Sequence, residues 1–235
     1  MKIVTNQSFL DKKAKLGRRT SLAGMVILIA GLIISLTSPE WILASMACLI
    51  VGFALANVIG MYNLNRWVKE PRSDQIIVKV LKGLDNKHFL YNYVLPSPHV
   101  LMNPAGLFVL LPKRQEGKII CRGDRWRQKL RLGSLLRIFV DEPLGNPTEE
   151  LRAEVGALKR FLEKNSVTDV PVSGLVVFTS EKAELELEEP TFPAVKINEL
   201  KATLREISQE RDEGQILHAG RRKELAELFE RSAQA

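Results

Sequence analysis

Two long apolar stretches dominate the first third of the chain. Twenty residues without a charge lie between Arg19 and Glu40, and twenty-five more lie between Glu40 and Arg66. About 20 helical residues cross a hydrocarbon core roughly 30 Å thick, so each stretch can form one transmembrane helix. Because only a tight turn connects them, the two helices must return antiparallel. We therefore expect a transmembrane hairpin over 20–65, with spans at about 20–38 and 41–63.

Cations lie at both ends of this hairpin and not at its turn. Residues 1–19 form a basic N-terminus, and Arg66, Lys69 and Arg72 follow the second span. The positive-inside rule then predicts a two-span membrane protein with both termini in the cytoplasm. A cleaved signal peptide is the competing interpretation of the first span, but that span is long for a signal peptide and a second span follows at once.

Small residues recur at every fourth position of the second span. They are Ala44, Cys48, Gly52, Ala56 and Gly60. Such a stripe allows helix backbones to approach closely, so we expect it to pack against Gly24 and Gly31 of the first span rather than to form a dimer interface. Neither span contains an ionisable residue, so nothing indicates a transport pathway.

After residue 73 the periodicity changes to short elements of both kinds. Helical spacing over 73–84, 146–164, 198–207 and 214–231 alternates with β-like runs at 88–95, 99–103, 107–111, 118–121, 172–179 and 184–188. Asn146 followed by Pro147 is typical of a helix start. This order predicts an α/β (α+β) domain over 73–207, followed by a C-terminal amphipathic helix in 208–235.

Charge and cysteine content refine this assignment. The net charge is +7, but residues up to Ser73 carry nine Lys or Arg against three acidic residues, so most of the excess lies next to the hairpin. The two cysteines are too few for a disulfide framework, which fits a reducing cytoplasm.

One part of the domain resembles a known family. The stretch SPHVLMNPAGLFVLLPKRQEGKI, Ser97 to Ile119, is followed by Gly123-Asp124-Arg125-Trp126, and later by Asn146-Pro147, a helix and the strand VSGLVVFTS. These pieces, in this order, resemble the NERD domain, a nuclease-related family of the PD-(D/E)XK type. The resemblance implies a restriction-endonuclease-like mixed sheet flanked by helices.

The catalytic pattern of that family is incomplete here. Its chemistry needs acidic oxygens to hold magnesium and a lysine to assist the attacking water. The family places an acid where this chain has Pro98 and the glutamate of an E-x-K element where it has Leu111, whereas the lysine persists as Lys113. Asp74 and Glu116 are the other remnant candidates, with Glu116 more typical of a solvated turn. We expect no resident metal or cofactor; magnesium belongs only to the alternative of an active nuclease.

Other catalytic motifs are absent from the sequence. His99 has no second His or Cys at a metal-ligand spacing, so we expect it to be structural. No nucleophile elbow and no glycine-rich phosphate loop are present.

A basic stretch follows the remnant site. It has a net charge of +7 within 25 residues and contains Lys113, Arg114, Lys118, Arg122, Arg125, Arg127, Lys129, Arg131 and Arg137, with Trp126 between two arginines. Such a stretch can bind a phosphate backbone and stack a base, can lie on anionic lipid, or can be solvated or paired with the acidic run Glu184, Glu186 and Glu188.

The sequence as a whole predicts a membrane-anchored NERD-like cytoplasmic domain that is catalytically inactive. We expect it to act as a binding or structural module, with nucleic acid as one possible ligand. A metal-dependent nuclease and a lipid-contacting scaffold are the alternatives.

Overall fold

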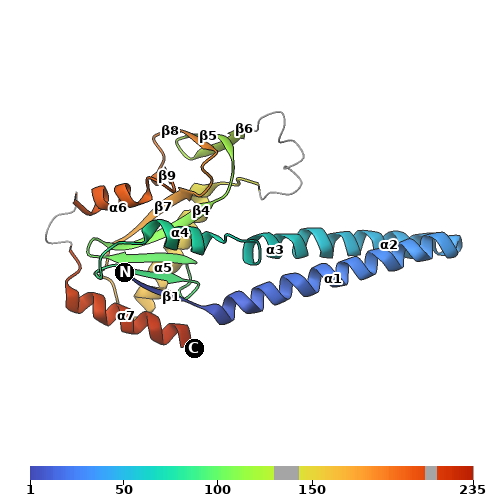
Figure 1. Cartoon of the computed structure of the whole chain (residues 1–235), viewed down its shortest axis with the longest axis horizontal. Coiled ribbons are helices and arrows are strands. Elements are labelled where there is room, and N and C mark those ends of the chain that lie inside the picture. The colour runs from blue at the N-terminus through green and yellow to red at the C-terminus, as the bar shows by residue number, and fades with distance from the viewer. Residues whose placement is uncertain (130–142, 210–215, 235) are drawn as a thin grey trace. The chain divides into compact units, whose positions relative to one another are not determined.

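The computed structural model of the chain describes residues 1–129, 143–209 and 216–234. These residues divide into two compact units. One unit combines Met1–Asn6 with Ser73–Ala235, and the other is Gln7–Arg72. Figure 1 labels most of the helices and strands of both units.

The Gln7–Arg72 unit is a helical hairpin. Helix α1 (Gln7–Thr37) is followed by the short helix η1 (Pro39–Trp41) at the turn. The return arm consists of α2 (Ile42–Phe53), a π-helical stretch η2 (Ala54–Met61) and α3 (Tyr62–Trp67). The predicted antiparallel pair of helices is therefore present. Helix α1 starts well before the predicted span, and the π-helical stretch has no counterpart in the sequence analysis.

Small residues bring the two arms of the hairpin into close contact. A side chain at Gly24 would place its Cβ 2.8 Å from the Cα of Ala56, and one at Gly52 would place it 2.8 Å from the backbone nitrogen of Leu28. A Cβ at Gly31 would lie 2.9 Å from that of Cys48. The hydroxyl of Ser45 donates a hydrogen bond across the hairpin to the carbonyl of Gly31 at 2.9 Å. The predicted packing of the small-residue stripe against Gly24 and Gly31 is thus confirmed.

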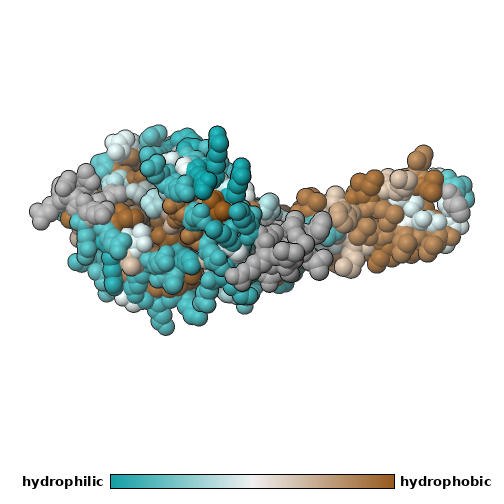
Figure 2. Space-filling view, turned by 90° about the horizontal axis from the view of Figure 1, so that it is seen from above, coloured by the Kyte–Doolittle hydropathy of each residue, from teal (hydrophilic) through white to brown (hydrophobic). Residues whose placement is uncertain are grey.

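The outer surface of the hairpin is apolar. Leucine, isoleucine, valine, methionine and phenylalanine side chains are exposed along both arms, and Figure 2 shows them as a hydrophobic surface. The helices Gln7–Thr37 and Ile42–Leu64 are long and apolar enough to cross a membrane. Only 11% of the most apolar window of each is buried, so neither has the surroundings of a core helix in a soluble protein.

The other unit is built on a six-stranded mixed sheet. Its strands, in spatial order, are β1 (Lys2–Thr5), β2 (Phe89–Asn92), β3 (His99–Asn103), β4 (Gly106–Lys113), β7 (Val172–Phe178) and β9 (Ala194–Lys196). Strands β2, β3 and β4 form an antiparallel meander, whereas β1, β7 and β9 each pair in parallel.

Helices cover both faces of this sheet (Figure 1). Helices α4 (Ser73–Leu81) and α6 (Leu200–Gln209) pack on one face, and α5 (Pro147–Lys164) and α7 (Ala219–Gln234) pack on the other. Alternate residues of β4 divide between the two cores, because successive side chains of a strand point to opposite faces. A mixed sheet flanked by helices is the fold class that the sequence predicts.

A smaller sheet adjoins the larger one. It contains β6 (Arg125–Lys129), β5 (Gly117–Arg122) and β8 (Ala183–Glu188) in that spatial order. Strand β5 pairs antiparallel with β6 and parallel with β8, so β6 and β8 are the two edge strands of the small sheet.

Three strands and the starts of two helices differ from the sequence analysis, since α7 begins at Ala219 and not at 214. Residues 1–19 are predicted to be a basic N-terminal segment, but Lys2–Thr5 pairs with β2 as a strand of the large sheet. Strands β6 and β9 were not predicted either. Helix α6 begins at Leu200 and not at 198, and the carbonyl of Glu199 accepts from the amides of Ala202 and Thr203 in its first turn.

Candidate functional site

The lysine that the family pattern retains is enclosed at the end of β4. The side chain of Lys113 is only 9% exposed. Its ammonium donates to both carboxylate oxygens of Glu150, each at 2.7 Å, and to the carbonyl of Leu144 at 3.0 Å. Glu150 lies in the first turn of α5, where Asn146 caps the helix by accepting from the amides of Thr148 and Glu149. The cap thus positions the carboxylate that neutralises Lys113.

The two positions that would carry family acids have other roles. Leu111 is 6% exposed and packs in the core that α5 and α7 cover. Pro98 ends the connection between β2 and β3, where its carbonyl accepts from the amide of Tyr93 at 2.7 Å. Within residues 1–129, 143–209 and 216–234, no group of three or more His, Cys, Asp or Glu side chains is placed to hold a metal ion.

The remaining candidates do not share a face of the sheet with Lys113. Asp74 is buried on α4, a helix whose Ile77 and Leu81 pack on the face opposite α5. Glu116 lies in the connection between β4 and β5, and its backbone carbonyl accepts from Nε2 of Gln128 at 2.8 Å. Glu150, which does contact Lys113, was missed by the sequence analysis, because it is 37 positions away and is one of two consecutive glutamates in the first turn of α5.

His99 has a structural environment, as expected. It is 3% exposed on β3, and its Nδ1 lies 2.9 Å from Oδ1 of Asn92 on the neighbouring strand. The ring of Tyr93 packs edge-on against it, with 4.9 Å between ring centroids.

The basic stretch is organised by the small sheet. Register places Lys118 and Arg122 of β5 between two other rows of charged side chains, those of β6 and those of β8. The acidic row consists of Glu184, Glu186 and Glu188. Lys118 forms an ion pair with Glu186 at 2.5 Å, and Arg122 forms one with Glu188 at 3.3 Å. The hydrogen bond and charge of Lys118 lower the pKa of Glu186. The cations of β5 are therefore paired internally.

The cations of the edge strand β6 have different surroundings. Arg125, Arg127 and Lys129 alternate along the strand, all three are exposed, and none forms an ion pair with a described residue. Directly opposite them on β5 stand Arg122, Ile120 and Lys118. We call these three β6 side chains the basic row.

Trp126 does not stand beside the arginines of this row. Its indole nitrogen donates to Oγ1 of Thr148 at 2.8 Å, and its ring packs against Phe178 with centroids 6.1 Å apart. The indole is partly buried against the core, on the side of β6 away from the basic row. This placement removes the exposed aromatic that base stacking was expected to use.

The turn between β5 and β6 is held by the acidic residue of the stretch. Asp124, in the turn between β5 and β6, accepts from Thr191 and Arg152, and the hydrogen bond from Thr191 lowers its pKa. These contacts fix the orientation of the β-hairpin β5–β6 on the domain.

The remaining cations of the stretch have different positions. Arg114 follows β4 and is half-buried. Arg131 and Arg137 lie outside the described residues.

These features define the class of the protein: an α/β domain on a mixed sheet, joined to an apolar helical hairpin, with a buried lysine where the family resemblance places a catalytic one. Residues 69–179 match the family model of the nuclease-related domain, NERD. The predicted resemblance to the NERD domain is therefore confirmed for these residues, which run from α4 to β7. Comparisons with curated proteins and with solved structures found no match.

Proposed function

We propose that this protein is a membrane-anchored NERD protein that binds nucleic acid through its basic row and has no metal-dependent nuclease activity. The observation that carries the proposal is the contrast between the two strands of the small sheet. The cations of β5 form ion pairs with β8, whereas Arg125, Arg127 and Lys129 project from the edge strand and form no ion pair with a described residue, although the charge of Lys129 contributes to lowering the pKa of Glu186.

Membrane anchoring is supported by the apolar exterior of the hairpin and by its connections. Both ends of the Gln7–Arg72 segment continue into the same folded unit. Two crossings return the chain to the side from which it started, so a two-span hairpin meets this requirement. The cations before and after the apolar helices favour the cytoplasmic side for that unit.

Loss of catalysis is supported by the environment of Lys113. Magnesium requires several oxygen ligands, and the family positions for two of them hold Leu111 and Pro98. The ammonium that would assist the reaction is already neutralised by Glu150 and enclosed. A lysine in this state stabilises the junction of β4 and α5 instead of facing a substrate.

The basic row suits the backbone of nucleic acid rather than its bases. Alternate residues of a strand lie about 7 Å apart, so three such cations form a short line of positive charge. Phosphate contacts of this kind carry no sequence information. Because Trp126 is engaged with Thr148, the row lacks an exposed stacking partner. We therefore expect binding without sequence preference.

Salt-dependent binding to duplex DNA tests this proposal. The full-length protein in nanodiscs of zwitterionic lipid is titrated with a labelled 30-base-pair duplex by fluorescence anisotropy over a series of KCl concentrations. Three phosphate contacts contribute a slope of about −2.7 to the plot of log K against log salt. The triple variant Arg125→Gln, Arg127→Gln, Lys129→Gln should reduce the slope by about that amount.

A matched control changes three exposed cations elsewhere on the domain. Lys159→Gln, Arg160→Gln and Lys164→Gln on α5 remove the same charge and should leave the slope nearly unchanged. If both triple variants reduce binding equally, only net charge matters and the basic row has no special role. Unchanged DNA binding in the β6 variant, together with loss of domain contact with anionic nanodiscs, would favour the lipid-contacting scaffold.

The same samples test the nuclease alternative, which the retention of Lys113 favours. Supercoiled and single-stranded DNA are incubated with Mg²⁺ or Mn²⁺, and we expect no cleavage. Cleavage that requires metal and disappears in Lys113→Ala would restore the nuclease and refute the inactive state proposed here.

A further inference from the structure

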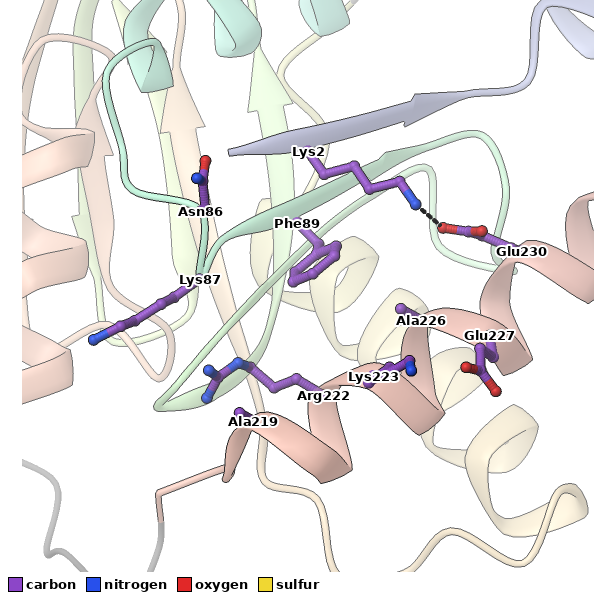
Figure 3. A pocket seen from close by; sticks show the side chains of 10 residues that line it. All are labelled: Lys2, Asn86, Lys87, Phe89, Ala219, Arg222, Lys223, Ala226, Glu227 and Glu230. Atoms are coloured by element: carbon purple, nitrogen blue, oxygen red, sulfur yellow. Dashed lines mark hydrogen bonds and ion pairs between the residues drawn. The ribbon is translucent and has the colours of Figure 1, made fainter.

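A second charged feature lies at the other end of the large sheet. A cavity of about 490 Å³ opens between the β1–β2 edge and helix α7 (Figure 3). Its lining residues come from β1, from the turn before β2, from the first residue of β2 and from α7, so it shares no residue with the basic row. This volume lies within the range of about 300–1,000 Å³ that is usual for small-molecule sites.

Positive charge predominates around the cavity. Four cations, Lys2, Lys87, Arg222 and Lys223, line it together with two carboxylates. One of the carboxylates, Glu230, is paired with Lys2 at 2.5 Å. This leaves Lys87, Arg222 and Lys223 against a single carboxylate, so the cavity favours an anion.

Arg222 is held in a fixed position on α7. Its Nη1 donates to the carbonyl of Leu217, and its side chain is half-buried. A guanidinium has five N–H donors in a planar fork, which leaves donors available after this bond is made. Such a group binds phosphate oxygens in a bidentate manner.

An aromatic ring forms the apolar part of the lining. Figure 3 shows the ring of Phe89 between Lys2 and α7. Phe89 is half-buried and packs on the core, and the buried Ala226 lies opposite it on α7. A flat apolar face beside a cluster of cations suits a ligand with a planar ring at one end and a charged group at the other.

The wall behind Glu230 contains an unsatisfied polar group. Tyr91, two residues after Phe89 on the same face of β2, is fully buried, and its hydroxyl has no hydrogen-bond partner within the part of the chain that the structure describes. Burial and the charge of Glu230 raise the pKa of this tyrosine, which keeps it neutral.

We propose that this cavity binds a mononucleotide, with its phosphate on the guanidinium of Arg222, its base against Phe89, and Lys87 and Lys223 on either side of Arg222 adding positive charge. The cavity contains no residue of the basic row, and nucleotide binding there involves no feature of nuclease chemistry. The proposal therefore stands or fails separately from the proposed function.

Equilibrium binding of AMP to the full-length protein in zwitterionic nanodiscs tests this inference. Saturable binding with a Kd below about 1 mM is expected. Lys87→Gln with Lys223→Gln, two exposed positions whose change leaves packing intact, should weaken AMP binding about tenfold or more. Phe89→Leu should weaken AMP binding and leave the weaker binding of inorganic phosphate unchanged, because only the base contacts the ring.

Controls separate the site from general attraction. The exposed pair Lys159→Gln with Lys164→Gln on α5 removes the same charge and should leave AMP binding unchanged. The proposal is wrong if AMP does not saturate, if the control pair weakens binding as much as the cavity pair, or if inorganic phosphate binds as tightly as AMP. Equally tight binding of a short-chain anionic phospholipid would also overturn it, since that result assigns the cavity to lipid headgroups.

Discussion

The ion pair between Lys113 and Glu150 predicts unequal effects of its two deletions. Glu150→Gln removes the negative charge that neutralises an ammonium whose side chain is 9% exposed. Breaking a fully buried pair costs about 3–5 kcal/mol, and the 45% exposure of Glu150 admits some water, so we expect about 2 kcal/mol. Lys113→Met retains the apolar contacts and leaves a carboxylate that water can reach, so it should cost less than about 1 kcal/mol.

Thermal unfolding of the full-length chain in one detergent measures this difference. The chain has three tryptophans, and replacing Trp41 and Trp67 by phenylalanine makes Trp126 the reporter of the domain. At about 2–4 °C per kcal/mol, Glu150→Gln should lower Tm by about 4–8 °C and Lys113→Met by less than about 4 °C. In the Lys113→Met background, Glu150→Gln should lower Tm much less than it does in the original chain, because the ammonium that Glu150 neutralises is absent. Equal losses for the two single variants, or a larger loss for Lys113→Met, would refute the reasoning.

Two further outcomes follow from the hairpin and from α7. Gly24→Leu should separate the arms of the hairpin, because its side chain would overlap the backbone of Ala56, whereas the exposed Ala23→Leu should not; distances between spin labels on α1 and α2 distinguish the two. The hydrogen bond from Arg221 lowers the pKa of Asp169 from its ordinary value of 3.8. This contact therefore stabilises α7 above that value and is lost as the pH falls through the lowered pKa. Arg221→Gln should remove that part of the acid dependence of hydrogen exchange in α7, and an unchanged acid profile would contradict the assignment.

Local patterns predicted most elements of the domain. The cap at Asn146 and the strands on either side of Pro104 depend on neighbouring residues, so the sequence alone indicates them. The apolar character of the two long helices is equally local. The resemblance to the nuclease-related domain also came from short segments, and the family match confirmed it.

Contacts between distant residues were not predictable in the same way. Glu150 reaches Lys113 only because α5 crosses the end of β4, and nothing in the order of residues shows that crossing. Trp126 between two arginines is typical of an exposed binding motif, yet strand alternation turns it toward Thr148. An isolated run of four residues such as β1 carries too little pattern to indicate a strand whose partner lies 87 positions away.

That separation gives β1 a particular place in the order of folding. Closing a flexible loop of 87 residues opposes pairing by about 4 kcal/mol of chain entropy. If the Gln7–Arg72 hairpin forms first, the flexible part of the loop shortens to about 20 residues and the opposing entropy falls to about 3 kcal/mol. Folding of the hairpin would then assist completion of the large sheet. The edge strand β1 is therefore the strand whose formation depends most on the helical hairpin having folded.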